Sequence, residues 1–404
     1  MKEHNKPSIL LVENIHPVAK EILEGHGYHV DLLTYAPGED ELIKLLPNYC
    51  AFGIRSKTEV TAKVIEHSQN ILTIGAFCIG TNQIDLLNAR KKGIAVFNAP
   101  HSNTRSVAEL VIAEMVALSR QLGDRNTKAH QGDWIKSAEG SREVRGKVLG
   151  IVGYGHIGSQ VSILAEAMGL RVVFFDVLKK LPLGNAQAMS SLKELLEVAD
   201  FVTLHVPEVP ETMNMISKKE LGQMKNGSYL INASRGTVVV IEDLVESLKS
   251  KHIAGCAIDV FPIEPASNKE RFTSPLQGLP NVILTPHIGG STEEAQKSIG
   301  IEVAESFRRY LKIGSSSGAV NFPNVDLPIK KGTSRILNVH RNEPGVLGEI
   351  NTIMSNAGAN IEGQYLSTDD EIGYLVMDVH SSQASQLAQN IEKLSRSIRT
   401  RIVS

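Results

Sequence analysis

Apolar residues in the first hundred positions gather in short runs that alternate with amphipathic stretches. The first run is SILLV at residues 8–12, and residues 17–26 after it repeat their apolar positions with a helical period. Similar runs follow at residues 28–33, 51–56, 71–77 and 94–100. The runs are continuous rather than alternating, as in strands buried on both faces of a parallel sheet. This pattern predicts an α/β fold in which helices cover a parallel sheet.

A second set of strands and helices follows a long helical pattern over residues 106–122. Ser106 and Glu109 have the spacing of a capping box at the start of that helix. Strands are predicted over residues 147–152, 170–176, 199–207, 227–236 and 253–261. Helices are predicted over residues 159–169, 192–198, 218–224 and 292–311. The alternation predicts a second doubly wound, Rossmann-like parallel sheet.

A change of composition marks the last part of the chain. Residues 312–332 are rich in Ser, Gly and Pro and carry little periodicity, which is typical of a linker. The remaining residues follow the order strand, helix, strand, strand, helix, strand of a small ferredoxin-like module. We therefore predict a discontinuous first domain, a central domain, a linker and a C-terminal module, at residues 1–100 with 291–318, 101–290, 319–333 and 334–404 respectively.

Composition excludes several classes of function. The 42 Lys and Arg residues are balanced by 44 Asp and Glu, so no bulk positive charge attracts nucleic acid or a membrane surface. The three cysteines have no C-x-x-C spacing, which argues against a disulfide framework or a metal site. The first residues lack the apolar core of a signal peptide, and the apolar run at 107–118 is interrupted by Glu109 and Glu114. We expect a cytoplasmic protein that acts on small molecules.

Three glycines in the segment LGIVGYGHIGSQ form the pattern G-x-G-x-x-G, at Gly153, Gly155 and Gly158. The pattern alone is weak evidence, but here it follows a predicted strand, begins a helix and precedes a strand that ends at Asp176. This is the context of a dinucleotide-binding turn, with the pyrophosphate at the helix N-terminus. Asp176 can accept hydrogen bonds from ribose hydroxyls and would repel a 2′-phosphate, so NAD is favoured. The lysines at 179–180 leave NADP as the alternative.

Three later strands end in side chains that suit the oxidation of an alcohol. They are followed by Arg235 in NASRG, Glu264 in DVFPIEP and His287 in TPHIGG. A nicotinamide enzyme needs a base for the hydroxyl proton and a cation for the substrate, and ligands collect at the carboxyl ends of parallel strands. Each residue alone could equally serve the structure, His287 for example by capping a turn.

The segments GYGHIG, HVPEVPET, INASRGTVV, AIDVFPIEP and LTPHIGGSTEEA, in this order, resemble the D-isomer-specific 2-hydroxyacid dehydrogenase family. The segments RSKTEVTAKVI and VFNAPHSNTRSVAEL and the C-terminal module narrow the resemblance to the branch that carries one ACT domain and acts on 3-phospho-D-glycerate. The resemblance implies two Rossmann-like domains, a ferredoxin-like ACT domain and NAD-dependent oxidation to 3-phosphohydroxypyruvate, toward L-serine.

Two other functions stay open. A reductase of 2-oxoglutarate, glyoxylate or hydroxypyruvate would use the same three residues. A dinucleotide-sensing corepressor would share the fold without the chemistry.

The resemblance also implies a role for each candidate residue. His287 would be the general acid and base, Glu264 would raise its pKa and fix its tautomer, and Arg235 would clamp the substrate carboxylate. NAD would be bound by Gly153, Gly155, His156, Ile157, Gly158, Asp176, Ala233, Ser234, Arg235, Asp259, His287, Ile288, Gly289 and Gly290. The phosphorylated substrate would be bound by Arg55, Ser56, Asn103, Lys136 and Arg235. Lys136 could equally make only surface ion pairs.

The C-terminal module contains the turn VHRNEPGVL at residues 339–347, which begins a helix whose free N–H groups can receive a carboxylate. The resemblance places L-serine between paired modules, at His340, Asn342 and Asn360. Glu343 stands where relatives often have a basic or neutral residue, so we expect its charge either to weaken effector binding or to change which effector is preferred. Contacts through the NAD-binding and ACT domains would together build a homotetramer.

Overall fold

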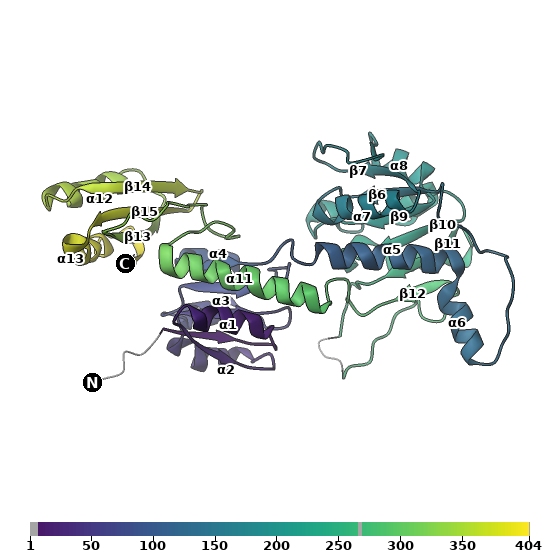
Figure 1. The fold of residues 1–404 in the computed structure, drawn as a ribbon, viewed down its shortest axis with the longest axis horizontal. Coiled ribbons are helices and arrows are strands. Elements are labelled where there is room, and N and C mark those ends of the chain that lie inside the picture. The colour runs from purple at the N-terminus through teal and green to yellow at the C-terminus, as the bar shows by residue number, and fades with distance from the viewer. Residues whose placement is uncertain (1–6, 266–268, 404) are drawn as a thin grey trace. The chain divides into compact units, whose positions relative to one another are not determined.

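The computed structural model describes residues 7–265 and 269–403 and divides the chain into two compact units. The first unit comprises Met1–Ser102 and Gln296–Ser404, and the second comprises Asn103–Ala295 (Figure 1). Residues 1–6, on which part of the signal-peptide prediction rests, lie outside the described residues. No helix in the described ranges is long and apolar enough to cross a membrane. The four-part domain division stays a prediction.

The first unit contains a five-stranded parallel sheet in the order β2-β1-β3-β4-β5. Its strands are β1 (Ser8–Leu11), β2 (His29–Leu32), β3 (Ala51–Ile54), β4 (Thr73–Ala76) and β5 (Ala95–Phe97). The connecting helices are α1 (Pro17–Gly25), α2 (Glu39–Leu45), α3 (Ala62–His67) and α4 (Leu86–Lys91). These elements confirm the predicted parallel α/β arrangement.

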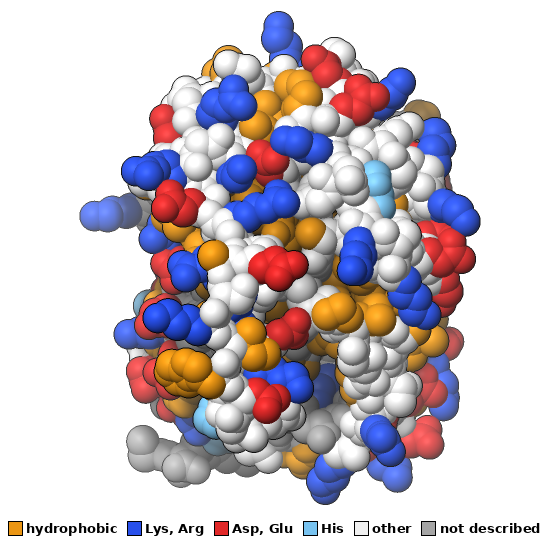
Figure 2. All heavy atoms as spheres, turned by 90° about the vertical axis from the view of Figure 1, so that its right-hand side faces the viewer, with side chains coloured by type: hydrophobic (Ala, Val, Ile, Leu, Met, Phe, Trp, Pro, Cys, Tyr) orange, Lys and Arg blue, Asp and Glu red, His pale blue; other side chains and the backbone are white. Residues whose placement is uncertain are grey.

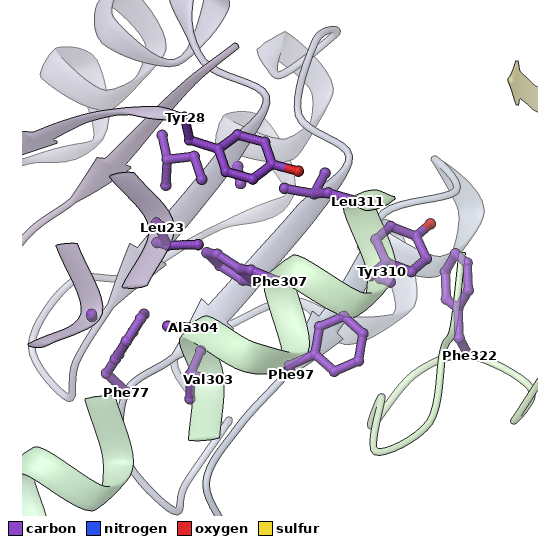
Figure 3. Close-up of a cluster of buried hydrophobic side chains, with 14 of the residues drawn as sticks. Leu23, Tyr28, Phe77, Phe97, Val303, Ala304, Phe307, Tyr310, Leu311 and Phe322 are labelled. Atoms are coloured by element: carbon purple, nitrogen blue, oxygen red, sulfur yellow. The ribbon is translucent and has the colours of Figure 1, made fainter. Parts of the chain in front are cut away.

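Helix α11 (Glu293–Ile313) completes the core of this unit. Its residue Phe307 packs against Phe77, with ring centroids 6.2 Å apart, and Tyr310 packs against Phe97 of β5 at 5.8 Å (Figure 3). Helix α11 lies close to the sheet: a Cβ built on Gly75 of β4 would lie only 2.5 Å from Val303 Cγ1. A glycine in the strand therefore determines how near the helix can lie.

The second unit is a seven-stranded parallel sheet in the order β12-β11-β10-β9-β6-β7-β8. Its strands are β6 (Val148–Val152), β7 (Arg171–Phe175), β8 (Gln187–Ala188), β9 (Phe201–Leu204), β10 (Ser228–Asn232), β11 (Ile253–Ile258) and β12 (Val282–Leu284). Its helices are α5 (Thr104–Arg120), α6 (Leu122–His130), α7 (His156–Ala167), α8 (Leu192–Val198), α9 (Lys218–Gln223) and α10 (Ile241–Lys249). The strand order reverses at β6, which is where open sheets of this kind bind ligands.

The start and end of helix α5 differ from the prediction. The capping box is wrong, because the N-cap is Asn103 and Ser106 lies inside the first turn, where its hydroxyl is 2.7 Å from Thr292 Oγ1. Glu109 instead binds the Arg105 guanidinium at 2.6 Å. The helix ends at Arg120 because Gln121 takes a left-handed conformation with φ of 51°. The apolar pattern continues across that turn, so periodicity alone could not locate it.

The C-terminal sheet is antiparallel, in the order β14-β15-β13-β16. Its elements are β13 (Thr333–Arg341), α12 (Val346–Asn356), β14 (Ile361–Thr368), β15 (Ile372–His380), α13 (Ser381–Glu392) and β16 (Ser397–Val403), which confirms the predicted ferredoxin-like order. Helices α12 and α13 cover one face, while Leu337 and Tyr374 on the other face join the core that contains Tyr310. The preceding segment 314–332 contains no helix or strand, yet Phe322 and Val325 in it are buried.

A buried ion pair connects the C-terminal sheet with that segment. Arg335 Nε and Nη2 donate to the two carboxylate oxygens of Asp378 at 2.7 and 2.8 Å, and both residues are almost fully buried. The remaining guanidinium protons reach the carbonyls of Ile313, Leu327 and Pro328. Each of these hydrogen bonds helps to compensate the charge of the buried guanidinium. Because two of the carbonyls belong to the segment, the ion pair holds the segment against the sheet.

Replacing Asp378 with alanine should therefore leave the Arg335 charge buried without its partner. We expect Asp378→Ala to lower the free energy of unfolding by about 3–5 kcal/mol, measured by urea denaturation of the full chain. Asp370→Ala is the control, because Asp370 is exposed and makes no side-chain bond within the described ranges. Equal stability of the two variants would contradict this account of the pair.

Candidate active site

The glycine turn after β6 has the geometry that its sequence predicts. Gly153 has φ of 92°, and a Cβ there would lie 2.3 Å from the carbonyl oxygen of His205. A Cβ on Gly158 would lie 2.2 Å from the carbonyl oxygen of Gly153, so helix and turn pack without room for a side chain. A Cβ on Gly155 would meet no described atom within 4 Å. The chain therefore leaves open space at the one glycine where a ligand must approach.

The N-terminus of helix α7 begins beside this open space. Gly155 is its N-cap, and no side chain of the described residues caps it, so its first N–H groups can bind an anion. His156 and Ile157 form the first turn of the helix. Asp176, at the end of β7, accepts hydrogen bonds from the backbone N–H groups of Tyr154 and Leu178, each at 2.8 Å. The turn, the helix end and the carboxylate fit a dinucleotide.

His287 and Glu264 lie on the loops after two neighbouring strands, β12 and β11. His287 Nδ1 is 2.9 Å from Glu264 Oε2, and the backbone N–H of Phe261 donates to Glu264 Oε1 at 3.1 Å. A proton on Nδ1 leaves the lone pair on Nε2, where it can exchange a proton with a substrate. Half of the His287 side-chain surface is exposed, so that nitrogen has access to a ligand.

The ion pair raises the pKa of His287 and lowers that of Glu264. The hydrogen bond to Glu264 raises the pKa of His287 above its ordinary value, although burial acts against this. Burial alone would raise the pKa of Glu264, but the hydrogen bonds from His287 and from the Phe261 backbone hold that pKa below its ordinary value. The carboxylate therefore stays charged while the imidazole becomes a stronger base.

Arg235 belongs to the same site, because its positive charge lowers the pKa values of both His287 and Glu264. It follows β10, and its Nη1 donates to the carbonyl of Ser234 at 2.7 Å. Asn232, which the sequence analysis missed, accepts from the N–H and hydroxyl of Ser234 and donates to the Arg235 carbonyl at 3.0 Å. A polar residue at the end of an apolar strand is the signal that could have identified it.

Asp259 holds the loop that carries His287. It is buried, and its carboxylate accepts from the Thr285 hydroxyl and from the backbone N–H groups of Ile288 and Gly289, all at 2.7 to 2.8 Å. The backbone N–H of His287 donates to its carbonyl at 2.8 Å. The structure thus assigns Asp259 to the shape of the loop, and its predicted contact with nicotinamide stays a prediction.

Comparisons with known proteins agree with this geometry. Residues 112–289 match the NAD-binding domain of the D-isomer specific 2-hydroxyacid dehydrogenases, and residues 336–399 match an ACT domain like that of the AHAS small subunit. The D-3-phosphoglycerate dehydrogenases of Haemophilus influenzae and Escherichia coli K12 are each 50% identical, over 99% of this chain and 98% of theirs. The chain belongs to the D-isomer-specific 2-hydroxyacid dehydrogenase family.

Solved structures extend the likeness. TT0316 protein from Thermus thermophilus is 30% identical, covers 78% of this chain and 99% of its own, and superposes with a TM-score of 0.71. D-lactate dehydrogenase from Aquifex aeolicus, solved with NAD and lactic acid, is 27% identical over 78% of this chain and 100% of its own, with a TM-score of 0.68. The family enzyme described here is an NAD-dependent oxidoreductase with a C-terminal ACT domain, which confirms the predicted resemblance and cofactor.

A buried acid close to Asp259 was not predicted as part of the site. Glu114 on helix α5 is 4% exposed, and neither carboxylate oxygen has a hydrogen-bond partner among the described residues. Burial, with the charge of Asp259, raises its pKa to about 8. The sequence analysis treated Glu114 as a charge that interrupts an apolar run. Its position on the apolar face of the helix was the signal that it is buried.

The predicted phosphate-binding residues are divided between the two units. Arg55 and Ser56 follow β3 in the first unit, while Asn103 and Lys136 lie in the second. Asn103 is buried at the start of α5, and Lys136 lines a hollow of about 800 Å³ together with the exposed Trp134. On the face of the second unit drawn in Figure 2, Lys and Arg side chains are interspersed with Asp and Glu. Joint binding of substrate by these four residues stays a prediction.

The predicted effector residues lie at opposite ends of the C-terminal sheet, because Ile361 pairs with Val379 beside Ser334, whereas His340 pairs with Gly373. His340 is buried on β13, its Nδ1 lies 2.9 Å from Asn338 Oδ1, and burial lowers its pKa. Asn342 donates to the carbonyl of Asp369 at 2.6 Å, and Asn360 directly precedes β14. Glu343 is bound by Arg396 Nε at 2.9 Å, so its charge is paired within the module. Whether these residues bind an effector stays a prediction.

The pair of His287 and Glu264 predicts a shifted pH profile. Glu264→Gln removes the charge that raises the pKa of His287, so that pKa should fall. Oxidation needs the neutral imidazole, so the pH at which the rate of oxidation rises should be lower in the variant. Reduction needs the imidazolium, so the pH at which the rate of reduction falls should be lower as well. We also expect kcat to fall by about tenfold or more, measured by NADH absorbance across pH. Glu242→Gln, at an exposed helix position, is the control, and an unmoved midpoint would refute the pairing.

Proposed function

We propose that this enzyme oxidises 3-phospho-D-glycerate to 3-phosphohydroxypyruvate with NAD, the first committed step toward L-serine. The observation that carries the proposal is the His287–Glu264 pair, with Arg235 beside it, in the same unit as the dinucleotide turn. Full-length relatives at 50% identity are D-3-phosphoglycerate dehydrogenases, which supports this substrate over other 2-hydroxy acids.

Each residue of the site has one task in this reaction. Arg235 binds the substrate carboxylate through its planar guanidinium and polarises the forming ketone. His287 Nε2 accepts the hydroxyl proton while Nδ1 stays bonded to Glu264, whose negative charge stabilises the imidazolium that results. NAD, held by the Gly153–Gly158 turn and Asp176, supplies the hydride acceptor when bound. In the reverse direction the imidazolium returns the proton.

The regulatory part of the proposal concerns residues 334–404. L-serine binds between two paired modules at His340, Asn342 and Asn360 and inhibits the enzyme, and the ACT family match supports an amino-acid effector there. Gly345, with φ of 94°, is the N-cap of α12, whose N–H groups suit a carboxylate. Arg396 pairs with both Glu343 and Glu349, so the Glu343 charge expected to act on the effector is compensated only in part.

Assembly and location belong to the same proposal. Trp134 is 88% exposed beside Ile135 in the NAD-binding unit, which favours burial against a second copy. Strand β14 is an edge of the C-terminal sheet and can pair with another edge. Two such contacts would build a homotetramer. The three cysteines form no disulfide within the described ranges, in keeping with a reducing cytoplasm.

The substrate can be tested directly by NADH absorbance. We expect the wild-type enzyme to reduce 3-phosphohydroxypyruvate with a higher kcat/KM than 2-oxoglutarate, glyoxylate or hydroxypyruvate, because the phosphate is the group that Arg55 and Lys136 are proposed to bind. L-serine should suppress that turnover. Preference for an unphosphorylated acid without any effect of serine would instead favour the alternative reductase.

A catalyst can also be separated from a dinucleotide sensor. His287→Ala should lower kcat by roughly 10²–10⁴-fold because the proton acceptor is lost, while NADH binding measured by fluorescence should persist. His26→Ala, at an exposed position of the first unit, is the matched control. Retained turnover in His287→Ala would exclude this histidine as the general base.

A further inference from the structure

Glu13 is a buried acid at the end of the first strand, outside the catalytic group. Its exposed fraction is 9%, and both it and Asn14 have left-handed backbones, with φ of 62° and 54°. Hydrogen bonds hold this turn from two sides, because Glu13 N–H donates to the carbonyl of Tyr35 and Asn14 N–H to that of Leu33. The strained turn directs the Glu13 side chain beneath the loop that follows β3.

The carboxylate of Glu13 binds the backbone of that loop. Backbone N–H groups of Arg55 and Thr58 donate to Oε1 at 3.0 and 2.8 Å, and the N–H of Lys57 donates to Oε2 at 2.9 Å. Gln83 fixes the same loop from outside, because its Nε2 donates to the Arg55 carbonyl at 2.7 Å. A buried carboxylate with three N–H donors is fully compensated only while the loop keeps this conformation.

The same hydrogen bonds determine what the loop presents to a ligand. Three of its four N–H groups face Glu13, and the remaining one, on Ser56, has no acceptor among the described residues. The Arg55 guanidinium and the Ser56 hydroxyl likewise have no hydrogen bond or ion pair within the described ranges, and Ser56 is exposed. A guanidinium, a hydroxyl and an amide N–H on one short loop are the groups that bind a phosphate monoester.

We propose that Glu13 is a positioning residue for the phosphate group of the substrate, acting through the loop of residues 55–58. The buried carboxylate holds this loop so that Arg55 and Ser56 keep a fixed orientation, and it makes no contact with the substrate itself. The proposal rests on the proposed function, in which Arg55 and Ser56 bind the phosphate of 3-phosphoglycerate. It predicts that Glu13 governs selectivity for phosphorylated acids rather than the hydride transfer.

Glutamine is the most informative replacement at this position. Glu13→Gln keeps the size of the side chain but turns one acceptor oxygen into an NH₂ group, which cannot accept from the loop. Glu59→Gln makes the same chemical change at the residue that directly follows the loop. The Glu59 side chain is exposed and has no hydrogen bond or ion pair within the described residues. Comparing the two separates the buried carboxylate from the general loss of one negative charge.

The experiment measures steady-state reduction by the full-length enzyme, with 3-phosphohydroxypyruvate and with hydroxypyruvate. Glu13→Gln should raise KM for the phosphorylated acid by about tenfold or more, while kcat changes by less than roughly threefold. KM for hydroxypyruvate and for NADH should stay within about twofold of wild type, because neither uses the loop. Glu59→Gln should match wild type throughout.

Four results would overturn the proposal. An unchanged KM for the phosphorylated acid, or an equal rise in KM for both acids, would reduce Glu13 to a structural residue. A wild-type enzyme without preference for the phosphorylated acid would refute the proposed function, and this inference with it, before any variant is compared. A preference that survives in Glu13→Gln would refute the inference alone.

A double-mutant cycle keeps the test decisive if Glu13→Gln is poorly folded. Glu13→Asp retains the charge but withdraws it by one methylene, and should raise the same KM in smaller measure. In an Arg55→Gln background, either Glu13 change should raise KM by less than it does alone, because both act through one loop. Additive effects of the two positions would contradict positioning through Arg55.

Discussion

The buried carboxylate of Asp259 is the interaction on which the active-site loop depends. It lies at the end of β11 and accepts from the Thr285 hydroxyl and from the N–H groups of Ile288 and Gly289 on the loop after β12. A charge in the protein interior is tolerated only when such donors surround it. The loop therefore cannot relax without exposing that charge to an apolar environment, and His287 keeps its place opposite Glu264.

The same device recurs at other strand ends of the molecule. Glu13 collects three loop N–H groups after β3, and Asp176 collects two beside the glycine turn. The C-terminal sheet differs, because Asp378 lies within strand β15 and is paired with the Arg335 guanidinium, which also binds three carbonyls. Since loops cannot complete a sheet ladder, side-chain carboxylates satisfy their N–H groups instead. Loops that carry function thus become as well defined as the strands.

Parallel topology explains why residues far apart in sequence share a site. Arg235, Glu264 and His287 follow β10, β11 and β12, which are neighbours in the sheet. The carboxyl ends of parallel strands all face one edge, so each return of the chain adds one side chain there. The Aquifex aeolicus D-lactate dehydrogenase is similar to this chain in its overall fold.

The sequence by itself determined the alternation of strands and helices and the dinucleotide turn, and it singled out three candidate catalytic residues. Continuous apolar runs and the glycine spacing are local signals, which explains why helix α8 was predicted with its observed bounds. The tertiary structure decided what depends on contacts across the chain. Periodicity could not show that Gln121 breaks the helix, that Asn103 rather than Ser106 caps it, or that Glu13 and Glu114 are buried. A charged residue is expected at the surface when only the sequence is known. Whether it is buried depends on hydrogen-bond donors and apolar neighbours that only the folded chain brings together.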